Sequence, residues 1–159
     1  MFYIFNVIKG RMCAPFWTMY GGDHCFEILY QKLSHSAAES HCVSSGGHLA
    51  SFHTKEELEF MRKLASDNNI EEFWVGFFTK KEREYFWTDG SKVDFIHSNS
   101  INLATENACY RYKRQNNEFK GRNCADLLRF MCKMKPKGKS MRISTLILEN
   151  ENFYIDIRE

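Results

Sequence analysis

Six cysteines are the residues of this sequence whose chemistry is easiest to constrain. Their number is even, their spacing is wide, and no two of them form a CxxC pair. Because zinc sites usually contain close pairs of ligands, this spacing favours disulfides over a metal site. Disulfides persist in oxidising compartments, so we expect an extracellular protein, either secreted or the ectodomain of a surface protein. Spacing alone does not choose a pairing among Cys13, Cys25, Cys42, Cys109, Cys124 and Cys132.

A cluster of cations near the last cysteines is the second group that could do chemistry. Glu118 is the only acid among them, and Tyr110 and Tyr112 alternate with two of the cations. A strand here would carry rings on one side and charges on the other. The cluster predicts a surface for an anionic or protein ligand, with rings for apolar contact and arginines for bidentate pairing. The alternative is a solvated edge strand that is protected by charge. The cations of the cluster are Arg111, Lys113, Arg114, Lys120 and Arg122.

Histidine is the other residue type that could bind a metal or act in catalysis. His41 and His48 lie on the two sides of a Gly-Gly pair and have no HExxH-like spacing, so the sequence predicts no metal site. His41 is next to Cys42, but a disulfide-bonded cysteine has no thiolate to act as a nucleophile. We therefore expect no catalytic residue and no enzyme activity.

The composition argues against several partners. The chain of 159 residues has 22 Lys and Arg against 20 Asp and Glu, mixed along the sequence, so nucleic acid is not an expected partner. No stretch has the ~20 apolar residues of a membrane-spanning helix. Residues 1–12 contain a short apolar run, which we interpret as the remnant of a signal or an anchor.

Two helices are predicted from their capping signals. The first covers residues 36–47, where Ser36 and Glu39 have capping-box spacing and a Gly-Gly pair ends the helix. The second begins at Thr54, and Glu57 is the acid expected to complete its capping box.

Strands and loops are predicted from apolar runs and polar gaps. Residues 71–78 predict a strand buried on both faces, with a close backbone approach at Gly76. Residues 79–84 predict an exposed turn, and residues 91–107 and 116–123 predict loops. Further strands are expected in residues 25–33, 47–53, 85–88, 109–113 and 127–133.

This order of elements predicts an α+β fold, and the length of the chain predicts one domain. A basic linker and a tail follow at residues 135–159, and the tail could form a strand pair or stay disordered. Several rings lie in the apolar strands, so core packing is expected for them rather than sugar stacking; these rings are Trp74, Phe77, Phe78 and Trp87.

Three short segments occur in a characteristic order. Trp-Val-Gly-Phe at residues 74–77 is similar to a Trp-Ile-Gly-Leu strand, and Phe-Trp-Thr-Asp-Gly at residues 86–90 to a Trp-Thr-Asp-Gly turn. Leu-Arg-Phe-Met-Cys at residues 128–132 has the matching end. Together with Cys42 on the first helix, these segments resemble the C-type lectin-like domain family, and the resemblance covers residues 13–134.

The resemblance implies a fold and a disulfide pattern. The fold has two helices packed on antiparallel sheets with a long loop region. In the long form of the family the bridges are Cys42 with Cys132, Cys109 with Cys124, and Cys13 with Cys25.

The resemblance also bears on calcium. In sugar-binding members, calcium lies at the long loop, and its ligands come from a Glu-Pro-Asn or Gln-Pro-Asp tripeptide and a Trp-Asn-Asp tripeptide. Calcium takes roughly six to eight oxygens. Here the first tripeptide falls near residues 99–101, Asn-Ser-Ile, and the second on residues 119–121, Phe-Lys-Gly. Glu106 and Asn107 still offer oxygens, but beside a cation they make a poor site, so we expect no cofactor and no usual calcium-dependent sugar site.

The resemblance therefore implies a non-enzymatic extracellular recognition module of the C-type lectin type. Its expected partner is an anionic glycan or a cell-surface or extracellular protein. A carbohydrate-binding lectin with a displaced or calcium-independent site is the alternative. The expected ligand-binding residues are Asn99, Glu106, Asn107, Arg111, Arg114, Lys120 and Arg122.

Overall fold

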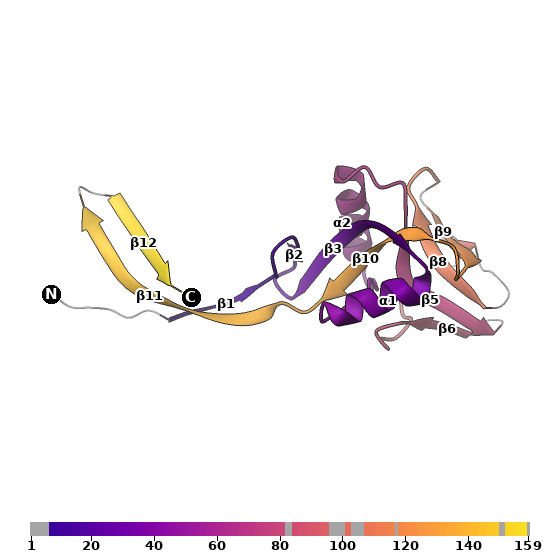
Figure 1. Cartoon of the computed structure of the whole chain (residues 1–159), viewed down its shortest axis with the longest axis horizontal. Helices are drawn as coiled ribbons and strands as arrows, with labels where there is room; N and C mark the ends of the chain where they lie inside the picture. The colour runs from indigo at the N-terminus through magenta and orange to yellow at the C-terminus, as the bar shows by residue number, and fades with distance from the viewer. Residues whose placement is uncertain are drawn as a thin grey trace.

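The computed structural model describes residues 7–81, 84–95, 101–102, 107–116, 118–149 and 152–158. In these residues the chain forms helices α1 (His35–Ser44) and α2 (Lys55–Asp67) and two sheets, so the predicted α+β class is confirmed. Figure 1 shows both helices beside the larger sheet, while the smaller sheet extends away from them to one side. Neither of these two helices is long and apolar enough to cross a membrane.

The larger sheet runs in the order β2-β3-β10-β5-β8-β9-β7, with β4 paired to β10 and β6 paired to β5. Its strands are β2 (Thr18–Tyr20), β3 (His24–Leu33), β4 (His48–Leu49), β5 (Glu72–Lys81), β6 (Glu84–Trp87), β7 (Ile101–Asn102), β8 (Ala108–Lys113), β9 (Glu118–Asn123) and β10 (Leu128–Met134).

Strand β5 divides the interior into two cores because its side chains alternate between the faces of the sheet. Phe73, Val75 and Phe77 pack in the cluster that contains the buried side of α2. Trp74 packs on the other face with Ala38 of α1 and donates a hydrogen bond from Nε1 to the Leu33 carbonyl at 3.0 Å. The prediction of a strand buried on both faces is confirmed.

Gly76 of β5 lies where two other segments cross the strand. Its N–H donates to the Ala50 carbonyl at 2.9 Å, and its carbonyl accepts from the Thr88 N–H at 2.8 Å. A Cβ atom here would lie 2.6 Å from Thr88 Oγ1 and 2.7 Å from the Leu49 carbonyl oxygen. The predicted close approach is therefore confirmed, and it is part of what fixes the turn after β6.

The cap predicted for α2 is confirmed, and the cap predicted for α1 is wrong. Thr54 caps α2 as predicted and accepts from the Glu57 N–H at 3.1 Å. The cap of α1 is Ser34, so the predicted Ser36 cap is wrong. Glu39 instead reaches out of the helix and accepts from the Leu49 N–H at 2.9 Å, which joins α1 to β4.

Three predicted loops or turns take a different form. Residues 118–123 form strand β9, so the loop predicted there is wrong; backbone pairing with β8 outweighs the polar composition. Strand β5 continues to Lys81 and buries Thr79, which shortens the exposed turn expected after residue 78. Of the loop expected at 91–107, residues 101–102 pair with β9 as the short strand β7.

The tail forms the strand pair that was one of its two alternatives. Strands β11 (Lys137–Glu149) and β12 (Asn152–Arg158) are antiparallel, and β1 (Val7–Met12) pairs with the first part of β11. These strands are the smaller sheet of Figure 1.

All six cysteines are in disulfides, with the pairing that the family resemblance implied. Cys42 of α1 is bonded to Cys132 of β10, which fastens this helix to the sheet. The other bridges join Cys13 to Cys25 and Cys109 to Cys124.

We expect Gly76→Ala to destabilise the fold by about 2 to 3 kcal/mol. The new methyl group would overlap Thr88 Oγ1 and the Leu49 carbonyl oxygen, and the backbone oxygen cannot move away without shifting the chain. Urea unfolding followed by tryptophan fluorescence measures the change. Gly138→Ala is the control, since no atom lies within 4 Å of the Cβ added there. Equal stability of the two variants would contradict the crossing at Gly76.

Candidate functional site

Strands β8 and β9 carry three of the seven residues predicted to bind a ligand, Arg111, Lys120 and Arg122. They are antiparallel, with Tyr112 opposite Phe119 and Arg111 opposite Lys120. Opposed residues share a face of a sheet, so one face of this pair carries the rings and the other carries the charges. The predicted alternation along the strand is confirmed.

The ring face of the pair is core and not surface. Tyr110 is completely buried, Tyr112 is 2 % exposed, and Phe119 lies 4.9 Å from the stacked ring of Phe52. The expectation that the two tyrosines contact a ligand is therefore wrong. The physical reason is that the aromatic side of this strand pair covers the cluster beneath α2.

Arg111 is also removed from solvent. It is 4 % exposed, and its Nε lies 3.1 Å from Oε2 of Glu72 on the neighbouring strand. Arg111 was predicted to be part of the exposed cationic surface. That prediction fails because β5 and its carboxylate lie beside it, and a buried charge needs such a partner.

The other predicted arginines are at the surface and already paired. Arg114 forms an ion pair with Glu71, and this hydrogen bond lowers the pKa of the Glu71 carboxyl. Arg122 Nε lies 3.0 Å from Asp126 Oδ2. Lys120 is exposed and lies on the charged face. The positive charge of this surface is thus smaller than the sequence predicts.

The residues proposed as remaining oxygen donors are described only in part. Asn107 is exposed and has a left-handed backbone with φ of 46°. Asn99 and Glu106 lie outside the described residues. Among the residues that are described, no three His, Cys, Asp or Glu side chains are grouped to hold a metal ion.

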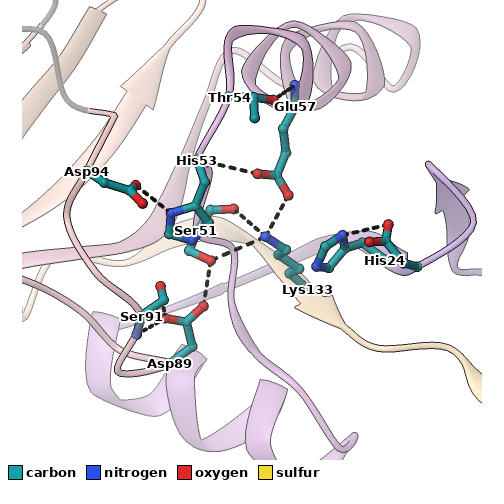
Figure 2. A network of polar contacts seen from close by, with 10 residues as sticks. His24, Ser51, His53, Thr54, Glu57, Asp89, Ser91, Asp94 and Lys133 are labelled. Atoms are coloured by element: carbon teal, nitrogen blue, oxygen red, sulfur yellow. Dashed lines mark hydrogen bonds and ion pairs between the residues drawn. The ribbon is translucent and has the colours of Figure 1, made fainter.

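A buried polar network lies at the base of the segments that lead to the long loop (Figure 2). Its centre is the Lys133 ammonium group on β10, 2.6 Å from Glu57 Oε1 on α2, with side chains 9 % and 5 % exposed. Lys133 also donates to the carbonyl and hydroxyl oxygens of Ser51, at 3.3 and 3.4 Å. A positive group thus already occupies the centre of these oxygens.

The network continues from Ser51 to the turn after β6. The Ser51 hydroxyl donates to Asp89 Oδ2 at 2.5 Å, and Ser91 donates to Oδ1 from its N–H at 2.9 Å and from its hydroxyl at 2.5 Å. Burial acts to raise the pKa of Asp89, but these hydrogen bonds outweigh it and hold that pKa below its usual value. The carboxylate therefore fixes the turn in its charged form.

A further link joins the segment before α2 to the residues after this turn. His53 Nδ1 lies 2.9 Å from Asp94 Oδ1, and the His53 N–H donates to Glu57 Oε2 at 2.8 Å. The hydrogen bond from His53 lowers the pKa of Asp94. The Glu57 carboxylate thus contacts both the Lys133 ammonium group and the backbone N–H of His53, just before the first turn of α2.

The serine and histidine of this network do not form a hydrolase triad. A triad requires the serine hydroxyl to donate to a histidine, whereas Ser51 donates to Asp89 and is completely buried. A cavity of about 690 Å³ opens beside the network, and its lining includes His24, His48, His53, Asp89 and Lys133.

Sequence reasoning did not identify Lys133, Ser51 or Asp89 as a unit. Lys133 is the one charged residue in the apolar run Phe-Met-Cys-Lys-Met at residues 130–134. A charge inside a predicted buried strand was a usable signal, because such a charge needs a partner. The identity of that partner depends on which helix covers this face of the sheet.

Comparisons with known proteins agree with this geometry. The family model described as the Lectin C-type domain matches residues 31–134. The chain belongs to the C-type lectin family. It is 31 % identical over 127 residues to C-type lectin 16 of Crotalus adamanteus, covering 77 % of this chain and 81 % of that protein. It is 32 % identical over 127 residues to the beta subunit of the snaclec bothrojaracin of Bothrops jararaca, covering 77 % and 83 %.

Solved C-type lectin folds are similar over the same region. A calcium-independent type II antifreeze protein superposes with a TM-score of 0.70 at 24 % identity, covering 80 % of this chain and 98 % of that one. This likeness concerns the fold alone. The family resemblance led us to expect the Trp-Asn-Asp tripeptide at residues 119–121. Here β9 buries Phe119 in the core and exposes Lys120.

We expect Lys133→Met to destabilise the fold by about 3 kcal/mol or more, because it leaves the Glu57 carboxylate buried without its partner. Urea unfolding at neutral pH measures this change. Lys63→Met is the matched control, since it breaks the exposed Lys63–Asp67 pair and should cost less than about 1 kcal/mol. Similar losses in the two variants would show that Glu57 is not left as an uncompensated buried charge.

We expect Asp89→Asn to cost about 1 to 2 kcal/mol at neutral pH through weaker hydrogen bonds from Ser51 and Ser91. The folded-state pKa of Asp89 is depressed, so its contribution is present above the unfolded pKa of about 4 and is lost as the pH falls through the folded pKa. The gap between wild type and variant should therefore narrow below about pH 4. Urea unfolding across this pH range tests it, and a constant gap would exclude the carboxylate as its source.

Proposed function

We propose that this chain is a non-enzymatic extracellular recognition module whose ligand is a protein or an anionic glycan. In this proposal the usual calcium-dependent sugar site of the family is lost. One observation carries the proposal: at residues 119–121, β9 offers an exposed ammonium group and no side-chain oxygen. Carbonyl, carboxylate and amide oxygens are what calcium requires, whereas an ammonium group attracts anions.

The disulfides support the extracellular and non-enzymatic parts of the proposal. All six cysteines are bonded to one another, which fits an oxidising compartment and leaves no thiol for nucleophilic chemistry. The serine and histidine closest to a catalytic arrangement are engaged elsewhere, with Asp89 and Asp94. These observations favour a binding function over catalysis.

The contact surface proposed for an anion is the charged face of β8 and β9. Lys120 supplies an exposed charge, and Lys113 lies further along the same face at partial exposure. Arg122, on this face, is exposed enough to exchange its carboxylate partner for a sulfate or a ligand carboxylate. Arg114 follows β8 and donates to Ser66 Oγ of α2 at 3.3 Å, so it lies on the ring side of the sheet and not on this face. Because such an exchange gains little net energy, the two lysines should dominate the affinity.

The relatives are compatible with either kind of ligand. One is called a C-type lectin and another is a subunit of an assembly. A calcium-independent protein has the same fold, so the fold itself does not require the ion.

The test combines calcium calorimetry with glycan-array binding in the presence and absence of EDTA. We expect no calcium-binding heat, and we expect signals for sulfated glycans that EDTA leaves unchanged. Lys120→Glu should weaken those signals by about fivefold, which corresponds to the upper range for an exposed ion pair. Lys80→Glu is the control, because Lys80 is an exposed lysine of β5 that lies near the Phe86 ring.

The possible outcomes separate the candidate functions. Calcium-dependent binding of neutral sugars would contradict the proposal. Binding of neutral glycans in EDTA would favour the alternative, a carbohydrate-binding lectin with a displaced site. Equal loss in the Lys120 and Lys80 variants would show that the anion signal comes from overall charge.

A further inference from the structure

Strand β3 has an unpaired edge over more than half of its length. On one side it pairs with β10 from Cys25 to Leu33. On the other side it pairs with β2, and that register joins Thr18–Tyr20 to residues 24–26. In the part of the chain that the structure describes, no strand pairs with this second edge along residues 27–33.

An unpaired edge is a specific chemical template. It presents alternating backbone N–H and C=O groups, which only another extended polypeptide can match along its whole length. The middle of this edge is open to solvent, since Tyr30, Gln31 and Lys32 are all exposed. In Figure 1, β2 runs beside the first part of β3 and stops short of the rest.

A cavity of about 510 Å³ lies along this edge. Its walls come from residues 26–31 of β3, from Phe16 before β2 and Thr18 of β2, and from Leu64 and Asn68 at the end of α2. Tyr30 is fixed over one side by a 2.9 Å hydrogen bond from its hydroxyl to Asn68 Oδ1. The cavity thus combines an edge of backbone with an apolar wall on the α2 side.

Phe16 at the rim of this cavity has two unfavourable properties at once. Its side chain is 93 % exposed, and its backbone is left-handed with φ of 71°. A bulky residue rarely adopts this conformation, and water does not favour an exposed ring. Phe16 lies in the loop that the Cys13–Cys25 bridge closes. Such strain is commonly kept where it serves binding.

The opposite side of the edge carries a carboxylate. Glu27 lies on the α1 side of β3, whereas Ile28 and Tyr30 lie on the α2 side. Glu27 is half-buried, and among the described side chains none forms a hydrogen bond or a salt bridge with it. Burial raises the pKa of this carboxyl, and the nearby His41 of α1 opposes that rise only in part. A cationic group from a partner would compensate for the missing partner.

We propose that the edge of β3 from Glu27 to Leu33 binds an extended peptide segment of a protein partner as an added strand. One side chain of the segment is apolar and enters the cavity between Phe16 and Tyr30. The neighbouring residue is basic and faces Glu27, because successive side chains of a strand point to opposite faces. The recognised pattern is therefore an alternation of apolar and basic residues.

This site is separate from the charged face of β8 and β9. In the sheet order, β3 is next to one end and β9 is next to the other. The proposal therefore does not rest on the anion surface, and each can fail without the other.

The probe is a fluorescein-labelled synthetic peptide, Thr-Val-Lys-Phe-Lys-Val-Thr, and fluorescence polarisation measures its affinity for the whole chain. Two N-methylated versions are compared, one methylated at each alternating set of amides. In an added strand one set points to the β3 edge and the other points away. We expect one version to lose affinity by about tenfold or more and the other to bind like the parent.

Protein variants test the two sides of the site. Phe16→Gly should keep the fold, since glycine favours the left-handed backbone, and should weaken binding by about tenfold through loss of the ring. Glu27→Gln should reduce binding of this peptide more than binding of a version with serine in place of lysine. Phe86→Ser is the control, because it removes a partly exposed ring from β6, away from this edge.

Several results would overturn the proposal. One is no binding of the parent peptide, and another is equal binding of the two N-methylated versions. A third is unchanged affinity in Phe16→Gly. A fourth is a wild-type dimer in sedimentation velocity that Phe16→Gly dissociates, because a second copy of the chain would then occupy this edge.

Discussion

The buried ammonium group of Lys133 constrains three segments of the described structure at once, namely β10, α2 and the segment at Ser51. A lysine in the interior is tolerated only with a charged partner and further hydrogen bonds. Here the partner is Glu57 on α2, and the ammonium group donates hydrogen bonds to the carbonyl and hydroxyl oxygens of Ser51. Its neighbour in β10, Cys132, points to the other face and is bonded to Cys42 of α1. Two consecutive residues of one strand thus fix both helices, one by charge and one by a covalent bond.

The position of the turn after β6 follows from this centre. Ser51 passes the constraint on to Asp89, and Asp89 fixes the turn through Ser91. A buried ion pair contributes little net stability compared with apolar packing, but its directional contacts select one arrangement of the segments that meet there. Stability comes mainly from the rings of the two cores, while the network sets which turn lies against which helix. A recognition surface needs the second property as much as the first.

Local patterns in the sequence predicted those features that depend on local chemistry. Gly76 and the Thr54 cap could be predicted because a strand interior and a helix start have strong local signatures. The disulfide pairing came from the family resemblance, since spacing leaves it open. Arg111 was wrongly placed at the surface, because its burial depends on the strand beside it and on Glu72. Strand β9 was missed because its polar residues carry no apolar alternation, and only pairing with β8 makes it a strand.

The two edges of the larger sheet are protected in different ways, and this difference bears on function. Near one edge, β9 pairs with β7, and the solvent-facing side of β8 and β9 carries charged residues. At β3 the edge stays unpaired after residue 26, and the ring of Phe16 stands at its rim. Charged side chains are a common protection of an edge against unwanted pairing, and Lys32 provides one here. Lys32 limits pairing at one end of the edge, while the cavity and Glu27 at the other end select the sequence that can pair. An edge with both features discriminates among peptides, whereas an edge with only the first would exclude them all.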